Sequence, residues 1–330
     1  MLKFFKHSYI AQLVVIVLLL VALWIPAFVS QFRDTAVGTP TTPLYNLIAG
    51  LFDSSSSAMT VLVFVVLGLS TLFFNSMLSV NQLVTRNSSI GAFIFVLCLC
   101  CVRLQDEYYP FLLSIPFIMM VVQTFYLIYQ VEKPEKYLMN AGFFLALASM
   151  FYFPSIMLIV WVLLAMLIMD VREPKDFLIP IMGFLIPYFI LFVCFFFNQT
   201  LIEKIEDYSL AFNELGFEKL GMTKLELVAM MLVFVFMALS LMMVKSRNAD
   251  NSVSTRKKVS VTLWLFAFGF LMLFMQKPVV CNGLIFMVLA IFVSMALSNI
   301  KKSKIIDIVL FVMMLAVIVN QYLPLLGIKL

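Results

Sequence analysis

The chain has 330 residues, of which 64% are hydrophobic and only 12% are charged, whereas soluble domains carry about 25% charged residues. Several apolar runs approach about 20 residues, the length of helix that crosses the hydrocarbon core of a bilayer. This composition excludes a soluble globular protein, and the continuity of the runs excludes a β-barrel, whose strands alternate in polarity. The net charge of +5 does not indicate nucleic-acid binding, because the basic residues cluster at the ends of apolar runs.

The apolar runs predict an all-α fold, namely a polytopic transmembrane helix bundle of about eleven spans. The predicted spans are 10–29, 58–80, 90–102, 110–129, 137–151, 154–169, 177–197, 225–244, 259–275, 279–297 and 305–325. Lys and Arg are concentrated in alternate turns, so the positive-inside rule places the N-terminus inside and the C-terminus outside. No polar stretch is long enough for a soluble domain, so residues 1–330 are predicted to be one integral-membrane domain.

Two regions of this prediction are ambiguous. Residues 137–169 could form one long span or a hairpin of two short ones. Basic residues on both flanks favour a hairpin that turns at residues 152–155, where Pro154 can open the second helix. The third span has only about 13 apolar residues, so we expect it to be buried in the bundle or to thin the bilayer locally.

The outer segments carry the residues best suited to chemistry. Asp34 follows the first span, and Asp106 and Glu107 directly precede the fourth. Carboxylates placed in this way could bind a hard divalent cation such as Mg²⁺ or Mn²⁺, or one could act as a general base. Arg33 and Arg103 could hold a lipid phosphate or pair with the neighbouring carboxylate. The alternative for each acidic residue is a solvated loop charge.

The outer loop after the seventh span has helical periodicity. Its apolar stripe is Leu201, Ile205, Tyr208, Phe212 and Leu215, with Gly216 as a natural C-terminal cap. We expect a helix that lies in the outer interface, either packed on the top of the bundle or acting as a lid over an outward cavity. The preceding outer segment contains a short apolar run, residues 44–52, that is too short to span a membrane.

Polar residues within the spans are few, namely Asn75, Gln123, Asn140, Asn282, Asp307 and Asn320. Buried amides usually join helices to one another. The absence of a row of ionisable residues across the bilayer weighs against an ion-coupled transporter. The five cysteines all fall in apolar runs and are predicted to be small buried hydrophobes: Cys98, Cys100, Cys101, Cys194 and Cys281.

An aspartate close after the first span and an Asp-Glu pair in the second outer loop resemble the core of the GT-C superfamily. These are integral-membrane glycosyltransferases that use polyprenyl-phosphate-linked sugars. The resemblance covers roughly residues 1–220 and leaves 221–330 as additional C-terminal spans. It implies that Asp34 is a catalytic base and that Asp106 and Glu107 are metal or phosphate-site ligands. The short first outer loop departs from that pattern, so a degenerate relative is included in the prediction.

The Phe- and Met-rich spans and the MLKFFK start also resemble an uncharacterised multispan inner-membrane family of Bacteroidota. That resemblance implies a bacterial inner membrane and no particular activity. The leading hypothesis is therefore a GT-C-like transferase, with membrane lipids and a polyprenyl-phosphate sugar as its partners. A non-catalytic subunit of a cell-envelope complex, bound to other membrane proteins, is the first alternative. A lipid or small-molecule transporter is the second.

Overall fold

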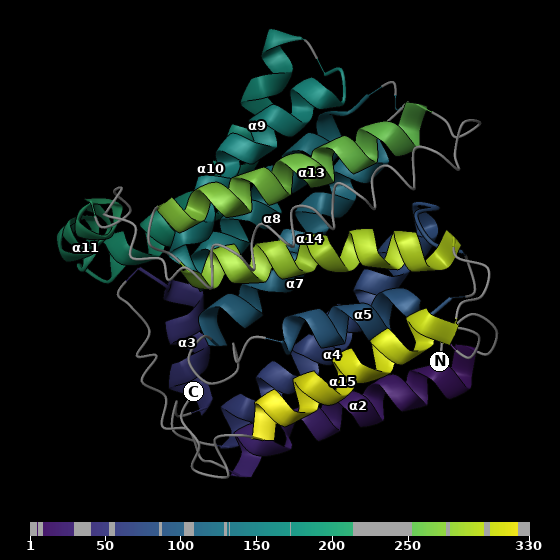
Figure 1. Ribbon diagram of the computed structural model, residues 1–330. Coiled ribbons are helices and arrows are strands. Elements are labelled where there is room, and N and C mark those ends of the chain that lie inside the picture. The colour runs from purple at the N-terminus through teal and green to yellow at the C-terminus, as the bar shows by residue number, and fades with distance from the viewer. Residues whose placement is uncertain are drawn as a thin grey trace.

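The computed structural model describes residues 5, 9–29, 41–52, 57–85, 88–101, 109–128, 131, 133–171, 173–213, 253–274, 278–299 and 304–322. The secondary-structure elements in these ranges are all helices (Figure 1): α2 (Tyr9–Val29), α3 (Pro43–Phe52), α4 (Ser57–Val80), α5 (Ile90–Leu99), α7 (Tyr109–Ile128), α8 (Glu135–Phe151), the 3₁₀ helix η1 (Phe153–Met157), α9 (Leu158–Ile168), the 3₁₀ helix η2 (Pro174–Phe177), α10 (Leu178–Phe197), α11 (Leu201–Asn213), α13 (Val253–Phe274), α14 (Pro278–Asn299) and α15 (Lys304–Tyr322).

Within the described ranges, five helices are long and apolar enough to cross a membrane. They cover Ala11–Phe28, Ala58–Val80, Tyr109–Ile128, Pro174–Phe197 and Lys304–Tyr322. The all-α membrane class is therefore confirmed, but the predicted count of eleven spans is not supported. Three further apolar helices are shorter, namely Ile90–Leu99, Phe153–Ile168 and Gly283–Ser298. The predicted span 225–244 lies outside the described residues.

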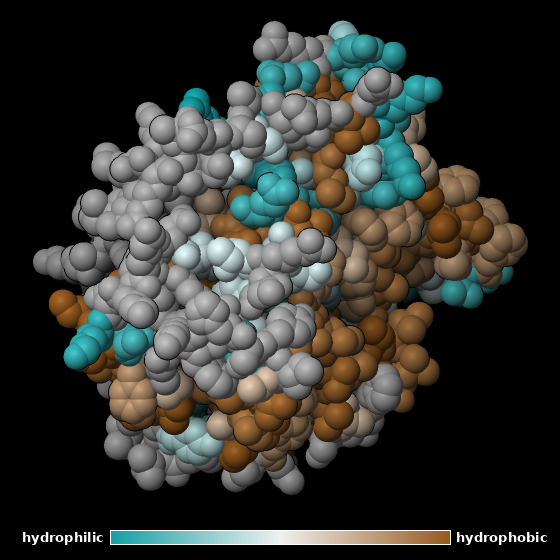
Figure 2. Space-filling model, turned by 90° about the vertical axis from the view of Figure 1, so that its right-hand side faces the viewer, coloured by the Kyte–Doolittle hydropathy of each residue, from teal (hydrophilic) through white to brown (hydrophobic). Residues whose placement is uncertain are grey.

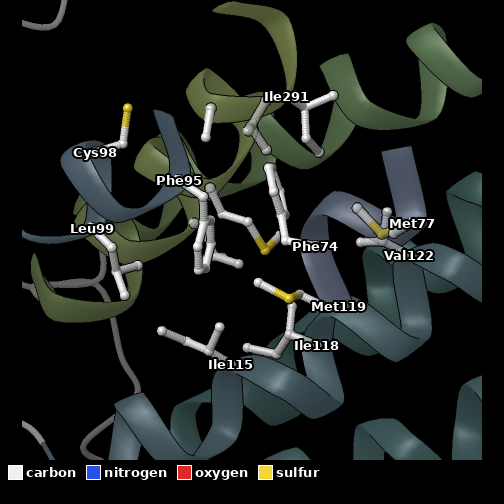
Figure 3. Packing of buried hydrophobic residues seen from close by; sticks show 14 of the residues in the cluster. Phe74, Met77, Phe95, Cys98, Leu99, Ile115, Ile118, Met119, Val122 and Ile291 are labelled. Atoms are coloured by element: carbon white, nitrogen blue, oxygen red, sulfur yellow. The ribbon is translucent and has the colours of Figure 1, made fainter. Parts of the chain in front are cut away.

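Helix α5 forms the centre of the bundle although it is only 10 residues long. Each of its residues is buried, and its side chains are at most 6% exposed. Phe95 on α5 stacks on Phe74 of α4, with the ring centroids 4.5 Å apart. Figure 3 shows Phe74 and Phe95 beside Met119 of α7, below Ile291 of α14. The sequence predicted that this short segment would be buried or would thin the bilayer, and burial is what the structure shows.

The two ends of α5 are held by side chains from other helices. At its start, the Ala92 N–H donates to Asn75 Oδ1 of α4 at 3.3 Å, and Ser89 Oγ donates to Gln12 Oε1 of α2 at 2.6 Å. Just beyond its end, the Cys100 carbonyl accepts a hydrogen bond from the Gln321 amide of α15. A helix that begins and ends inside a bundle needs such partners, because its terminal N–H and C=O groups have none within the helix.

Helices α8 and α10 approach so closely that glycine is required at two points. A Cβ atom added at Gly142 would lie 1.9 Å from the Pro180 carbonyl oxygen, and one at Gly183 would lie 2.2 Å from the Met139 carbonyl oxygen. Small residues at a crossing let two membrane helices pack backbone against backbone. The buried stripe of α10 consists of Pro180, Gly183 and Pro187, and most of its other side chains remain uncovered.

The hairpin predicted between α8 and α9 is confirmed. Tyr152 leaves α8 with an extended backbone (φ −141°, ψ 101°), and η1 follows with Pro154 at its start. The chain then returns along α9 to Asp170, which forms an ion pair with Lys257 of α13. Two short helices joined at a proline therefore replace the single long span that was the alternative.

The bundle has two ends that differ in their side chains. We call one the lysine end, defined by Asn81, Asp170, Lys257 and Lys258. Lys258 is hydrogen-bonded to the Asn81 carbonyl, and Lys257 forms an ion pair with Asp170. We call the other the tyrosine end, defined by Tyr109, Tyr152, Tyr208 and Tyr322. In Figure 1 the first turns of α13 lie at the right, whereas α3 and α11 lie at the left. The lysine end contains residues of the turns that the sequence predicted to be inside.

Candidate functional site at the tyrosine end

The helix ends next to the predicted acidic segments meet at the tyrosine end. Helix α4 contacts both α2 and α7 there. Phe64 packs edge-on against Trp24 of α2, with the ring centroids 5.8 Å apart. Thr60 shares a hydrogen bond of 3.0 Å with the Tyr109 hydroxyl of α7. The Tyr322 hydroxyl of α15 donates to the Ala22 carbonyl at 2.8 Å. The end of α2 and the start of α7 therefore belong to one face of the bundle.

The five residues that sequence analysis selected for chemistry lie outside the described residues. They are Arg33, Asp34, Arg103, Asp106 and Glu107. Asp34 follows α2 in the chain, and Asp106 and Glu107 precede α7. Their roles as base, metal ligands and phosphate contacts stay predictions. Within the described helices, no group of three or more His, Cys, Asp or Glu side chains is arranged to hold a metal ion.

Helix α11, Leu201–Asn213, confirms the predicted helix, and Leu215 and Gly216, the end of the predicted stripe and its cap, lie outside the described residues. Tyr208 packs against the bundle, with its ring centroid 5.5 Å from that of Phe153 on η1. Ile205 and Phe212 belong to the same stripe and are 54% and 59% exposed. Lys204 and Asp207, which pair at 2.9 Å, are half-buried. One part of the stripe therefore packs on the bundle, and the rest is uncovered.

The exposed residues of α11 mix apolar and acidic side chains. Ile202, Ile205 and Leu210 are uncovered, and Glu203 and Glu206 are exposed on the same helix. A helix of this kind suits the boundary between lipid and water, where apolar groups enter the acyl region and carboxylates stay hydrated. The rings of Phe153 and Tyr188 hold Tyr208, and through it α11, against the hairpin.

Buried hydroxyl groups gather beneath α11. Ser149 of α8 and Tyr188 of α10 share a hydrogen bond of 2.9 Å, and the Tyr188 ring lies 6.4 Å from that of Tyr208. The Tyr208 hydroxyl and the Ser155 Oγ are themselves buried without a hydrogen-bond partner. Burial raises the pKa of Tyr208, and the nearby Tyr188 and Asp207 raise it further, so this phenol stays neutral. Helices α8, α10 and α11 thus bring uncharged hydroxyls together, and Ser155 lies on η1, two residues from Phe153, whose ring packs on Tyr208.

Within the described residues, the fully buried side-chain polar atoms that lack a hydrogen-bond partner all lie in this half of the bundle. The buried side-chain polar atoms without a partner in the described chain are Trp24 Nε1, Ser155 Oγ and Tyr208 Oη. Such atoms are rare in proteins, and each one points to a ligand, a water molecule or stored strain. At the lysine end, by contrast, the Asn81 amide donates to both the Met77 carbonyl and Gln123 Oε1, at 2.7 Å each.

Some of the buried polar residues that join helices were predicted from the sequence, and others were not. Asn75, Gln123 and Asn320 were predicted to join helices, and all three do so. Gln12, Gln321 and the Tyr126–Thr262 pair (2.6 Å) were missed, although they are equally buried and polar. Gln12 and Gln321 lie close to the ends of predicted spans, where a polar residue in a sequence suggests exposure to water.

The cysteines were predicted to be buried hydrophobes, and this holds for two of them. Cys98 and Cys100 are buried on and next to α5, whereas Cys101 and Cys194 are exposed. Cys101 lies past the end of α5, and Cys194 lies on the uncovered side of α10. The side chain of Cys281 lies outside the described residues.

No protein-family model, no curated protein and no solved structure matches this chain. The resemblances to the GT-C superfamily and to the Bacteroidota family therefore stay predictions.

Proposed function

We propose that the protein is a GT-C-like membrane transferase, or a degenerate relative of one, that handles a polyprenyl-phosphate-linked sugar at the outer leaflet of the bacterial inner membrane. One observation carries this proposal. The helix ends that flank Asp34 on one side and Asp106 and Glu107 on the other meet at the tyrosine end, through Trp24–Phe64 and Thr60–Tyr109. The same end contains the buried hydroxyls without partners.

In the proposed reaction, an acceptor hydroxyl attacks the anomeric carbon of the lipid-linked sugar. The new carbon–oxygen bond forms as the bond to the phosphate oxygen breaks, and polyprenyl phosphate leaves. Asp34 takes the proton of the acceptor hydroxyl as general base. Arg33 and Arg103 bind the phosphate through their guanidinium groups. Carboxylates are the ligands that Mg²⁺ and Mn²⁺ prefer, so Asp106 and Glu107 would hold such a cation, which neutralises charge on the leaving phosphate.

The hydroxyls beneath α11 fit the sugar part of such a substrate. Ser155 and Tyr208 each offer a donor and an acceptor, and neither carries charge at neutral pH. A sugar presents the same uncharged donors and acceptors, and its apolar faces pack on aromatic rings such as that of Phe153. Tyr208 is the link between these groups and α11, which would cover the bound sugar.

A non-catalytic subunit of an envelope complex is the second candidate, and the surface of α10 favours it. Apolar side chains of α10 are uncovered along its whole length, from Leu178 to Phe197. Phe189, midway along the helix, is 66% exposed. An uncovered helix of this kind could pack against a partner in the membrane as well as against lipid.

The decisive experiment is complementation of a deletion strain with two variants, Asp34→Asn alone and Asp106→Asn combined with Glu107→Gln. Membrane levels of each variant and the lipid-linked glycans of the cells are measured together. We expect both variants to reach the membrane at normal levels, to lose function, and to accumulate a sugar-lipid. Glu206→Gln, an exposed carboxylate on α11, is the matched control and should retain function.

Full function in both variants would remove catalysis from the outer carboxylates. The subunit would then be the better proposal, and stable co-purification with other membrane proteins is the result that would support it. Loss of function in the Glu206→Gln control as well would show that any loss of charge at this end is harmful, which contradicts specific roles for Asp34, Asp106 and Glu107.

A further inference from the structure

The lysine end contains a half-buried cation that pairs with no carboxylate among the residues that the structure describes. Lys258 lies at the start of α13, and its ammonium donates to the Asn81 carbonyl, just past the end of α4, at 3.4 Å. The neighbouring Lys257 is different, because it forms an ion pair with Asp170. A Lys ammonium has three donors, so most of the hydrogen-bonding capacity of Lys258 remains unused in the described chain.

A second group with unused donors contacts the same residue, Asn81. The Asn81 side-chain amide donates to Gln123 Oε1 of α7 at 2.7 Å, which fixes the Gln123 amide next to Asn81. The NH₂ of Gln123 then has two further donors, and it makes no hydrogen bond within the described residues. Asn81 therefore connects the Lys258 ammonium on one side with the Gln123 amide on the other.

The position of Lys258 is fixed by α7. Its backbone carbonyl accepts a hydrogen bond from Thr262 Oγ1 at 2.8 Å, and the Thr262 hydroxyl shares a hydrogen bond of 2.6 Å with the Tyr126 hydroxyl. The Trp161 indole donates to the Val261 carbonyl at 3.2 Å, which joins α9 to the same turn of α13. The base of Lys258 is thus held rigidly, unlike that of a lysine on a free loop.

The location corresponds to the headgroup layer of a bilayer. The apolar part of α4 ends at Val80, and that of α7 ends at Ile128, both at the lysine end. Figure 2 looks onto this end and shows hydrophilic residues at its top and centre. Lipid phosphates lie at the depth where the apolar parts of spanning helices end, and basic pockets between helices there bind anionic headgroups.

We infer that Lys258 and Gln123 bind the phosphate of an anionic phospholipid in the leaflet at the lysine end. Phosphate oxygens are acceptors only, and they match the unused donors of the ammonium and the amide. An anionic headgroup is favoured over a zwitterionic one, because the Lys258 ammonium attracts the phosphate and would repel a choline. This inference concerns the end opposite to the proposed transferase site and does not depend on it.

The electrostatics of Lys258 agree with this assignment. Burial lowers the pKa of Lys258, and among the described residues no carboxylate raises it again. A phosphate against its ammonium would compensate for the lost hydration and would return the pKa towards its ordinary value.

The test is a lipid titration of the full-length chain followed by native mass spectrometry. The probes are dioleoylphosphatidylglycerol, which is anionic, and dioleoylphosphatidylcholine, which is zwitterionic. We expect the wild type to prefer phosphatidylglycerol by about tenfold, the size of effect that one charge-assisted hydrogen-bonded contact gives. Lys258→Gln should reduce this preference to about twofold. Lys258→Arg, which keeps the charge and the donors, should preserve most of it.

The matched control is Arg256→Gln, which removes the same charge from an exposed residue two positions away on the same helix. An equal loss of preference in Arg256→Gln and Lys258→Gln would overturn the inference, because it would show general attraction to a basic surface. A wild type with no preference between the two lipids would overturn it as well. Gln123→Met, which keeps the lysine, should also weaken the preference and gives an independent test should Lys258→Gln fail to fold.

The titration is repeated with inorganic phosphate at millimolar concentration to distinguish a lipid from a free anion. Unchanged binding of phosphatidylglycerol supports a lipid site, where the acyl chains contribute to affinity. Displacement of phosphatidylglycerol by inorganic phosphate would identify a free-anion site and contradict the inference.

Discussion

Helices α5 and α10 are both almost entirely apolar, yet they occupy opposite environments. Each residue of α5 is buried, whereas on α10 only Pro180, Gly183 and Pro187 are buried. In a membrane the hydrophobic effect does not decide between these environments, because lipid chains are as apolar as a protein interior. The difference lies in the contacts that each helix can make: α5 offers stacking rings and, at its buried ends, backbone groups that need hydrogen-bond partners, whereas α10 offers one narrow stripe of Pro and Gly residues. The comparison shows that helices here are placed by their hydrogen bonds and close packing rather than by their hydropathy.

The narrow stripe of α10 is the most sensitive part of the comparison. Gly142→Ala would place a Cβ atom 1.9 Å from the Pro180 carbonyl oxygen and 2.9 Å from the Phe184 nitrogen, both backbone atoms that cannot move aside. We expect a loss of about 4 kcal/mol or more in the free energy of unfolding, since α8 and α10 must separate. Thermal unfolding in detergent measures it.

Gly68→Ala is the control for that substitution, because the added Cβ atom would lie 3.7 Å from Leu20, at ordinary contact distance. It should leave the stability unchanged or raise it slightly, as alanine favours a helix more than glycine does. Equal stability of the Gly142→Ala and Gly68→Ala proteins would show that α10 is not held through this crossing.

The second prediction compares one phenylalanine from each helix. Phe95→Ala on α5 removes a ring that stacks on Phe74 at 4.5 Å and leaves a cavity inside the bundle. We expect it to cost about 3 kcal/mol. Phe189→Ala on α10 removes a ring that is 66% exposed and should change the stability by less than about 0.5 kcal/mol. Urea or SDS unfolding of the two variants in one detergent provides the measurement. A large loss for Phe189→Ala would mean that α10 has a protein partner.

The smallest expected effect concerns the end of α5. Gln321→Leu would remove the amide that donates to the Cys100 carbonyl, and we expect it to cost about 1 kcal/mol. Hydrogen exchange at the last turn of α5 is the more direct measurement, because fraying should begin there. Asn320→Leu, which removes the neighbouring bond to the Cys101 carbonyl on a more exposed residue, should have a smaller effect. An unchanged exchange rate in Gln321→Leu would indicate that α5 is held by packing alone.

Some of the candidate site could be read from the sequence. The helix of α11 followed from the recurrence of its apolar residues, whereas the sequence did not distinguish Tyr208, which packs on Phe153, from the uncovered residues of the same stripe. Ser155 lay in the predicted hairpin turn, but nothing in the sequence distinguished it from an exposed turn residue. That its hydroxyl is buried and without a partner depends on which elements close around it. The acidic residues Asp34, Asp106 and Glu107 were selected by position in the sequence alone.

The sequence by itself determined that this is an all-α membrane protein, that a hairpin turns near Pro154, and that basic residues gather at one end. These properties depend on each segment separately. In lipid a segment must form the hydrogen bonds of its own backbone, which it does as a helix, and its charged residues must stay near water. Only the tertiary structure decided that the short α5 is enclosed and that α8 and α10 touch at Gly142 and Gly183. It also decided that Asn81 is hydrogen-bonded to both Lys258 and Gln123. These properties depend on pairs of segments. Apolar helices have similar hydropathy, so the shape and the hydrogen bonds of the surfaces that meet decide which helices pack together.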